Sequence, residues 1–125
     1  MVRVNLVPPR ELMDQHLVAE YVEIMMLVGH VRKYPKLEGI PEDYRLGRGH
    51  IKFFKNKLLY LKRRHELIVK EMLRRGFKAE KVLDLKVFGK EHLGDWEPRA
   101  GDFKIIRARL REKIALKRDW YRYSG

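Results

Sequence analysis

A long and almost uniformly apolar stretch near the start of the chain constrains the fold most strongly. Within residues 10–32, apolar side chains recur at helical spacing and cover most of the circumference that a helix would present. A helix that is apolar on nearly all sides is stable only when other elements surround it. We therefore predict that this helix lies at the centre of the protein. Its apolar positions are Leu12, Leu17, Val18, Ala19, Tyr21, Val22, Ile24, Met25, Met26, Leu27, Val28 and Val31.

Two more segments have a helical pattern, and the rest of the chain is broken by glycine and proline. Residues 56–75 and 102–116 carry one apolar stripe each, whereas residues 34–54 and 77–101 contain repeated Gly or Pro and favour irregular connections. We predict an all-α fold, a single compact domain over residues 1–125 with three main helices and long irregular connections. The inward positions would be Leu58, Leu61, Leu67, Ile68 and Met72 in one stripe, and Ile106, Leu110 and Ile114 in the other.

The inventory of nucleophilic side chains excludes several classes of enzyme. The chain has no Cys and no Thr, and its only Ser is Ser124. This excludes disulfides, thiolate metal sites, cysteine nucleophiles, a Ser/His/Asp hydrolase and a phosphate-binding loop that ends in Lys-Ser or Lys-Thr. A covalent catalyst with this composition has to use Lys, Asp, Glu, His, Tyr or its own α-amine as the nucleophile.

The charge balance indicates a polyanionic partner. Lys and Arg number 29 against 17 Asp and Glu, which gives a formal net charge of +12 at pH 7. Such a field on a small protein is typical of nucleic-acid binding. No apolar run approaches the ~18 residues that a membrane span needs, so we expect no membrane association. We expect a cytoplasmic protein that associates with the nucleoid when it is on DNA.

Polar side chains interrupt the apolar helix along one face. His16, Glu20 and Glu23 are spaced i, i+4 and i+7 and share that face. A carboxylate at Glu23, between apolar neighbours, has to find a partner or become neutral, and such residues are common at active sites. An equally acceptable interpretation is that Glu23 pairs with one of the many Arg or Lys side chains. A metal site formed by the three residues is a weak alternative, and we predict no metal.

Basic and aromatic side chains supply candidates for DNA contact. Two cations at i and i+4 in the third helix can reach adjacent phosphates from one face. A Gly-Arg-Gly-His loop at residues 47–50 allows the backbone to approach a ligand closely. Aromatic rings at the end of the chain could stack on bases. For any one of these residues a solvated surface or packing role is the simpler interpretation, whereas the set with the net charge favours nucleic-acid binding. The candidates are Arg48, His50, Arg109, Lys113, Trp120 and Tyr121.

Short runs over nearly the whole chain follow the pattern of one enzyme family. The runs are residues 3–6, 11–23, 31–33, 46–54, 57–58, 94–96, 108–115 and 120–123, together with Arg74, Gly76 and Phe77. In these runs the chain resembles the pyrimidine-dimer DNA glycosylases. The resemblance implies removal of a damaged base followed by strand cleavage at the abasic site through β-elimination, without a metal or cofactor.

The resemblance also assigns roles to individual residues. It implies that the nucleophile is the α-amine of Val2 after removal of Met1, and that Glu23 stabilises the cationic sugar and assists proton removal. An α-amine has a lower reference pKa than a lysine, so more of it is the unprotonated base that can attack. The resemblance further places Arg3, Gln15 and His16 at the DNA-facing active site, and makes Arg109 and Lys113 a phosphate-contacting pair.

The expected substrate is duplex DNA that contains a cyclobutane pyrimidine dimer, kinked and with a base flipped out, and the expected enzyme is a monomer. Val22 and Met26 stand where a phage member of the family carries arginines, which leaves the preferred lesion open. A glycosylase for another damaged base and a non-catalytic module that binds distorted DNA are the alternatives.

Overall fold

The computed structural model describes residues 2–125, so the expected removal of Met1 concerns a residue outside that range. The predicted all-α fold is confirmed. The four α-helices are α1 (Asp14–Lys33), α2 (His50–Phe54), α3 (Leu58–Arg74) and α4 (Ala100–Leu116). Two 3-10 turns, η1 (Pro9–Glu11) and η2 (Lys90–His92), lie in the connections. Within residues 2–125 the only β-type pairing is one bridge between Lys57 and Leu93.

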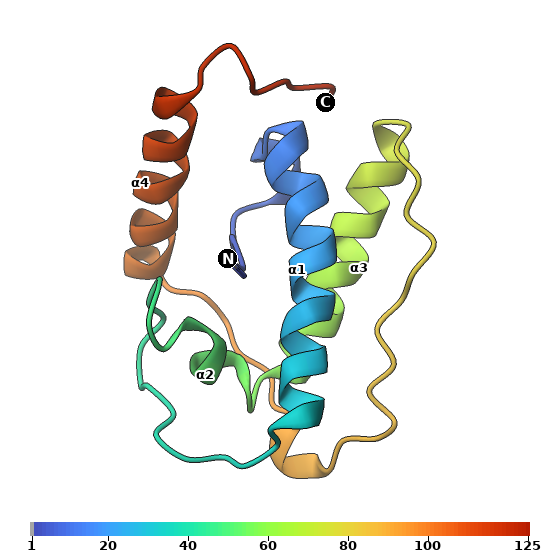
Figure 1. Cartoon of the computed structure of the whole chain (residues 1–125), viewed down its shortest axis with the longest axis vertical. Coiled ribbons are helices and arrows are strands. Elements are labelled where there is room, and N and C mark those ends of the chain that lie inside the picture. Colours follow the sequence, from blue (N-terminus) through green and yellow to red (C-terminus); the bar gives the residue numbers. More distant parts are fainter. Residues whose placement is uncertain (1) are drawn as a thin grey trace.

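Helix α1 forms the centre of the fold, as its apolar pattern predicts, but Val22 and Met26, two of the apolar positions in that pattern, are 48% and 57% exposed. Leu17, Ile24, Leu27 and Val31 are completely buried along it. Figure 1 shows α3 and α4 running antiparallel to α1, with the N-terminal segment between α1 and α4. This arrangement covers the apolar face of α1 on several sides and buries residues 4–7 of the N-terminal segment.

The structure corrects three details of the sequence prediction. The connection 34–54 contains the short helix α2, whose Phe53 and Phe54 are buried. Helix α1 begins at Asp14, not at residue 10, because the chain first forms η1 at Pro9 and then extends through Leu12. Leu67 is 53% exposed although we predicted it inward. Successive helical residues point about 100° apart, so the complete burial of its neighbour in sequence turns Leu67 outward.

None of the helices within residues 2–125 is long and apolar enough to cross a lipid bilayer.

The long connection between α3 and α4 packs against the central helix, where the amide of Lys81 donates a hydrogen bond to the Tyr21 hydroxyl. This hydrogen bond fixes the connection against α1.

Candidate active site

The N-terminal segment makes a tight turn before it reaches η1. Leu6 has a φ of 58°, the left-handed region that side chains other than glycine rarely adopt. The amide of Val7 donates to the carbonyl of Asn5 across it at 2.5 Å, which closes a three-residue turn. A non-glycine residue in this conformation persists only when surrounding contacts hold it. The side chains that hold this segment therefore fix the position of residues 2–4.

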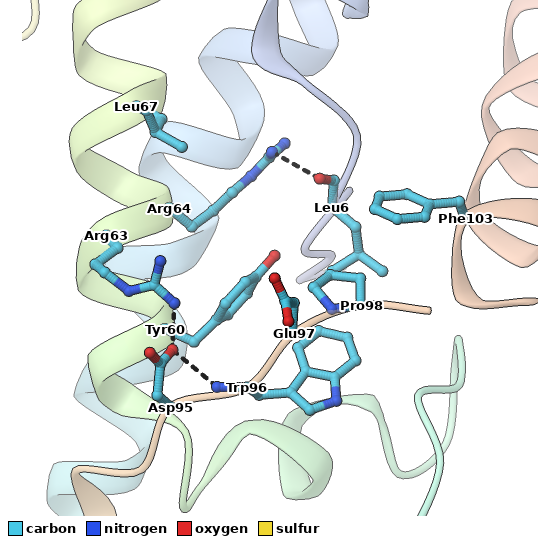
Figure 2. A pocket seen from close by; sticks show the side chains of 10 residues that line it. All are labelled: Leu6, Tyr60, Arg63, Arg64, Leu67, Asp95, Trp96, Glu97, Pro98 and Phe103. Atoms are coloured by element: carbon cyan, nitrogen blue, oxygen red, sulfur yellow. Dashed lines mark hydrogen bonds and ion pairs between the residues drawn. The ribbon is translucent and has the colours of Figure 1, made fainter. Parts of the chain in front are cut away.

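A buried ion pair between α1 and α3 binds the turn at Leu6. Arg64 of α3 and Glu20 of α1 are 3% and 0% exposed, and the guanidinium binds both carboxylate oxygens, at 2.7 and 2.9 Å. The same guanidinium donates to the carbonyl oxygens of Leu6, at 3.0 Å, and Val7. Figure 2 shows the Arg64 side chain reaching the Leu6 carbonyl. The pair thus satisfies its own buried charges and ties α1 and α3 to the first segment.

Two aromatic side chains hold the backbone of Val4. Its amide donates to Nε2 of His50 at 2.9 Å, and its carbonyl accepts from the Tyr44 hydroxyl at 2.8 Å. Because Nε2 accepts, the proton of the neutral ring lies on Nδ1, which is 2.7 Å from the Arg45 carbonyl oxygen. Burial and the charge of Arg3 lower the pKa of His50, which agrees with a neutral ring. Both ring nitrogens of His50 are thus engaged within the protein, so direct DNA contact by this residue stays an untested prediction.

Glu23 binds the backbone next to the residue that we expect to attack. Its Oε1 accepts the amide of Arg3 at 2.8 Å, and its side chain is half-buried on α1. The α-nitrogen of Val2 lies about 3.5 Å from the Arg3 nitrogen along the backbone, hence within about 6 Å of Glu23 Oε1. Burial raises the pKa of Glu23, and the Arg3 amide and guanidinium oppose this rise. This carboxylate is thus better suited to exchange a proton than a solvent-exposed glutamate.

The partners of the polar stripe differ from the simplest interpretation of the sequence. Of the two glutamates in the stripe, Glu20 pairs with an arginine side chain in the described structure, whereas Glu23 binds a backbone amide. Both Glu20 oxygens are bound by Arg64, while Nε2 of His16 lies 3.2 Å from the Tyr121 hydroxyl. His16, Glu20 and Glu23 therefore each bind a different partner and do not form one common site.

His16 lies in a cationic part of the site. Burial and the nearby charges of Arg3 and Lys113 lower the pKa of His16 to about 4. Its imidazole is therefore neutral at physiological pH and can accept or donate one hydrogen bond without adding charge. Arg3 itself is fixed by a 2.8 Å hydrogen bond to the Asn5 side chain. The structure thus brings together Arg3, His16 and Glu23, and Lys113 of α4 is close enough for its charge to act on His16.

Gln15 ties the C-terminal tail to the start of α1. Its amide nitrogen donates to the carbonyl of Trp120 at 2.5 Å, and its oxygen accepts the amide of Arg122 at 3.0 Å. The neighbouring Asp14 accepts from the amide and hydroxyl of Ser124. These bonds hold Tyr121 beside His16, with ring centroids 4.7 Å apart. Gln15 thereby supports the site, and its own contact with DNA stays a prediction.

The other candidate DNA-binding residues lie in two places, on α4 with the C-terminal tail and in the loop before α2. Arg109 and Lys113 are half-buried on one face of α4, and Trp120 is 55% exposed beside Tyr121. Arg48 is exposed in the glycine loop before α2. Two uncharged side chains flank Glu23 on α1, Val22 and Met26, and they are 48% and 57% exposed.

One sizeable cavity lies away from Glu23. It measures about 720 Å³ and lies between α3, α4 and the segment before α4. Figure 2 shows Tyr60 and Trp96 at its wall, with Leu6 at one side. The cavity reaches the far side of the strained turn and does not include Glu23 or residues 2–4 among its lining. The candidate active site is therefore the region around the N-terminal segment and Glu23, and not this cavity.

Comparison with known protein families gives one match. The sequence pattern described as pyrimidine dimer DNA glycosylase matches residues 1–85, which include the N-terminal segment, α1, α2 and α3. The chain belongs to this family. This match confirms the resemblance seen in the sequence. Membership of the family supports a DNA repair glycosylase that acts on pyrimidine dimers.

Sequence reasoning missed two residues that position the site. Tyr44 and Arg64 hold the N-terminal backbone from elements 40 and more residues away. The only sequence signal for Arg64 was the presence of a carboxylate on the apolar helix, which required some cation but could not indicate which one. Tyr44 gave no signal, because it lies in a connection without periodicity.

Proposed function

We propose that the chain is a DNA glycosylase with abasic-site lyase activity, and that its nucleophile is the α-amine of residue 2. The hydrogen bond from the Arg3 amide to Glu23 carries the proposal, because it places a half-buried carboxylate beside the start of the chain. Processing at Met1 would expose the amine of Val2. Its reference pKa near 7.8 leaves a useful unprotonated fraction at neutral pH.

The proposed reaction begins at the sugar of the damaged nucleotide. The lone pair of the amine forms a bond to C1′, and the glycosidic bond breaks with its electron pair leaving on the base, which is protonated. The nitrogen gives up one proton, which balances the proton taken by the base. Its lone pair then forms a protonated imine with C1′ as the C1′–O4′ bond breaks, and O4′ takes that electron pair together with a proton from water. A carboxylate within about 6 Å of that nitrogen stabilises the positive charge. Glu23 is the described carboxylate that meets this condition through the Arg3 amide.

The second step cleaves the strand. Glu23 takes the proton from C2′, the electrons form a double bond between C2′ and C3′, and the 3′ phosphate leaves with the C3′–O electron pair. Water then hydrolyses the imine and releases the amine. Burial raises the pKa of Glu23, which makes its carboxylate a stronger base than an exposed one.

The anchors of the N-terminal segment supply the orientation that this chemistry needs. The backbone of Val4 is bound on both sides by His50 and Tyr44, and the turn at Leu6 is bound by Arg64. An attacking group that is already fixed avoids the loss of freedom that a mobile chain end would undergo during the reaction. The three contacts therefore support a nucleophile at the start of the chain.

We propose cyclobutane pyrimidine dimers as the lesion, in agreement with the family. The experiment is a substrate panel of dimers, oxidised bases and plain abasic sites, with protein shown by mass spectrometry to begin at Val2. Glu23→Gln should bind dimer DNA but lose strand cleavage, whereas the exposed carboxylate change Glu66→Gln should retain it. Cleavage of oxidised-base DNA alone would favour the alternative glycosylase, and binding without any cleavage would favour the non-catalytic module.

A further inference from the structure

A second basic hollow lies beyond the site, at the other end of the central helix from Lys113. It measures about 420 Å³ and lies between the C-terminal end of α1, the connection before α2, and α2 itself. Figure 1 shows this connection leaving the end of α1 and passing near the start of α4, after which α2 leads back toward α3. No Asp or Glu lines the hollow. Its lining residues with side-chain nitrogen are His30, Arg45, Arg48, Lys52 and Lys55.

The cations of this hollow have no carboxylate partner. Within residues 2–125, no Asp or Glu oxygen lies within 4.0 Å of the charged nitrogens of Arg45, Arg48, Lys52 or Lys55. Elsewhere in the fold, the buried arginines are paired: Arg64 with Glu20, and Arg75 with two carboxylates. The hollow therefore gathers four cations, of which Lys55 is buried, with no carboxylate among its lining residues.

Lys55 makes the lack of a counter-ion costly. It is only 7% exposed, and the single acceptor of its ammonium group is the carbonyl oxygen of Lys36 at 3.2 Å. An ammonium group has three donors, and a buried charge without a counter-ion is unfavourable. An anion in the hollow would relieve this cost. Gly49, with a φ of 90°, lets the Arg45 side chain pack directly against the loop backbone, because a Cβ there would lie only 2.9 Å from that side chain.

The hollow follows the catalytic face of α1. His30, at its edge, is seven residues after Glu23 and therefore lies on the same side of the helix, about 10 Å further along the axis. Each strand of DNA carries one phosphate per ~3.4 Å along the duplex axis, so this distance corresponds to about three phosphates. Arg109 and Lys113 lie toward the opposite end of α1, where α4 and the C-terminal tail meet it. Glu23 is thus between two cationic regions.

We propose that this hollow binds a backbone phosphate of the substrate DNA, a few nucleotides to one side of the lesion. The proposal rests on the proposed function, because it takes the substrate to be duplex DNA aligned with α1. Arg45 and Lys52 reach the phosphate from the exposed rim, and Lys55 compensates its charge from within. Together with Arg109 and Lys113, the hollow fixes the duplex on both sides of the reacting nucleotide.

The test compares two pairs of charge removals in protein that begins at Val2. Arg45→Gln with Lys52→Gln removes two exposed cations of the hollow, and Lys70→Gln with Lys81→Gln removes two exposed cations remote from it. Affinity for dimer-containing duplex is measured by fluorescence anisotropy between 50 and 200 mM salt. Loss of one phosphate contact should reduce the slope of log K against log salt by about 0.9, and should weaken binding about 8-fold at 0.1 M salt. The control pair should change neither quantity by as much as half of this.

The length of the duplex identifies the source of the phosphate. Two shorter duplexes are trimmed to one nucleotide from the lesion, one on the 5′ side and the other on the 3′ side. The difference between the hollow variant and the unmodified protein should disappear with one of them and persist with the other. An equal difference with both would mean a general effect of charge or a site for free anions, and an unchanged salt slope would mean no contact; either result overturns the proposal. Failure of the proposed function is separate, since it would appear as no strand cleavage by the unmodified protein on any duplex.

Discussion

Removing the guanidinium of Arg64 is the perturbation that most directly tests how the N-terminal segment is held. In Arg64→Met the side chain keeps its apolar stem but loses all of its donors. Glu20, with 0% exposure, would keep a buried carboxylate without a cation, and the carbonyl oxygens of Leu6 and Val7 would lose their partner. Each of these changes destabilises the folded state, because buried polar groups that lose their hydrogen bonds are not compensated by water.

The size of the effect follows from the burial of the pair. Removing one partner of a buried ion pair costs about 3–5 kcal/mol in the free energy of unfolding. An entropy of unfolding of about 2.1 cal/mol/K per residue gives about 0.26 kcal/mol/K for a chain of this length. A loss of about 4 kcal/mol therefore lowers Tm by about 15 °C.

The matched control is the adjacent arginine. Arg63 also pairs with a carboxylate, that of Asp95, but both side chains are about half exposed, at 53% and 52%. Figure 2 shows Arg63 and Arg64 on the same helix, with Arg63 directed to Asp95 and Arg64 to the carbonyl of Leu6. Arg63→Met should cost less than about 1 kcal/mol, since exposed pairs contribute little. Thermal and urea unfolding of both variants, followed by circular dichroism, measure the difference. Equal destabilisation within 1 kcal/mol would refute the assignment of Arg64 as the main anchor.

Three further predictions concern the site. Because burial raises the pKa of Glu23, the carboxyl carbon of Glu23 should titrate above the ordinary glutamate value of 4.5 in 13C nuclear magnetic resonance, and titration at or below 4.5 would contradict its role as a base. The folded pKa of His16, about 4, is below its ordinary 6.5, so the stability that its neutral ring contributes is complete above pH 6.5 and is lost as the pH falls toward 4. Nuclear magnetic resonance should accordingly show no titration of His16 between pH 5.5 and 8. Gln15→Ala should remove both bonds to the tail and speed hydrogen exchange at the amide of Arg122 at least about 5-fold, whereas unchanged exchange would mean that other contacts hold the tail.

The sequence predicts the helical framework well because the strongest helix signals are apolar patterns that the core requires. The stretch from residue 10 to 32 has to be central, and α1 is. Helix α2 was not predictable, because five residues are too few to show a period. The exposure of Leu67 depended on which of two adjacent apolar residues faces the core, and only the packing of α3 decides that.

The site could be predicted in part for a related reason. A carboxylate on an apolar helix is an unusual feature in any sequence, so Glu23 could be predicted as a site residue. Its partner is the backbone amide of Arg3, which no sequence pattern indicates. The pairing of Glu20 with Arg64 joins residues 44 positions apart and could have involved any of the chain's cations. The tautomer of His50 likewise depends on tertiary contacts with Val4 and Arg45.

The location of the trapped imine tests the central claim most directly. Protein verified by mass spectrometry to begin at Val2 is incubated with dimer-containing duplex and borohydride, which reduces the imine to a stable amine, and the adduct is then mapped by peptide sequencing. We predict that the DNA remnant is attached to the α-nitrogen of Val2, next to the amide that Glu23 binds. An adduct on a lysine, such as Lys57, whose pKa is lowered by burial, would contradict the account, as would the absence of any adduct.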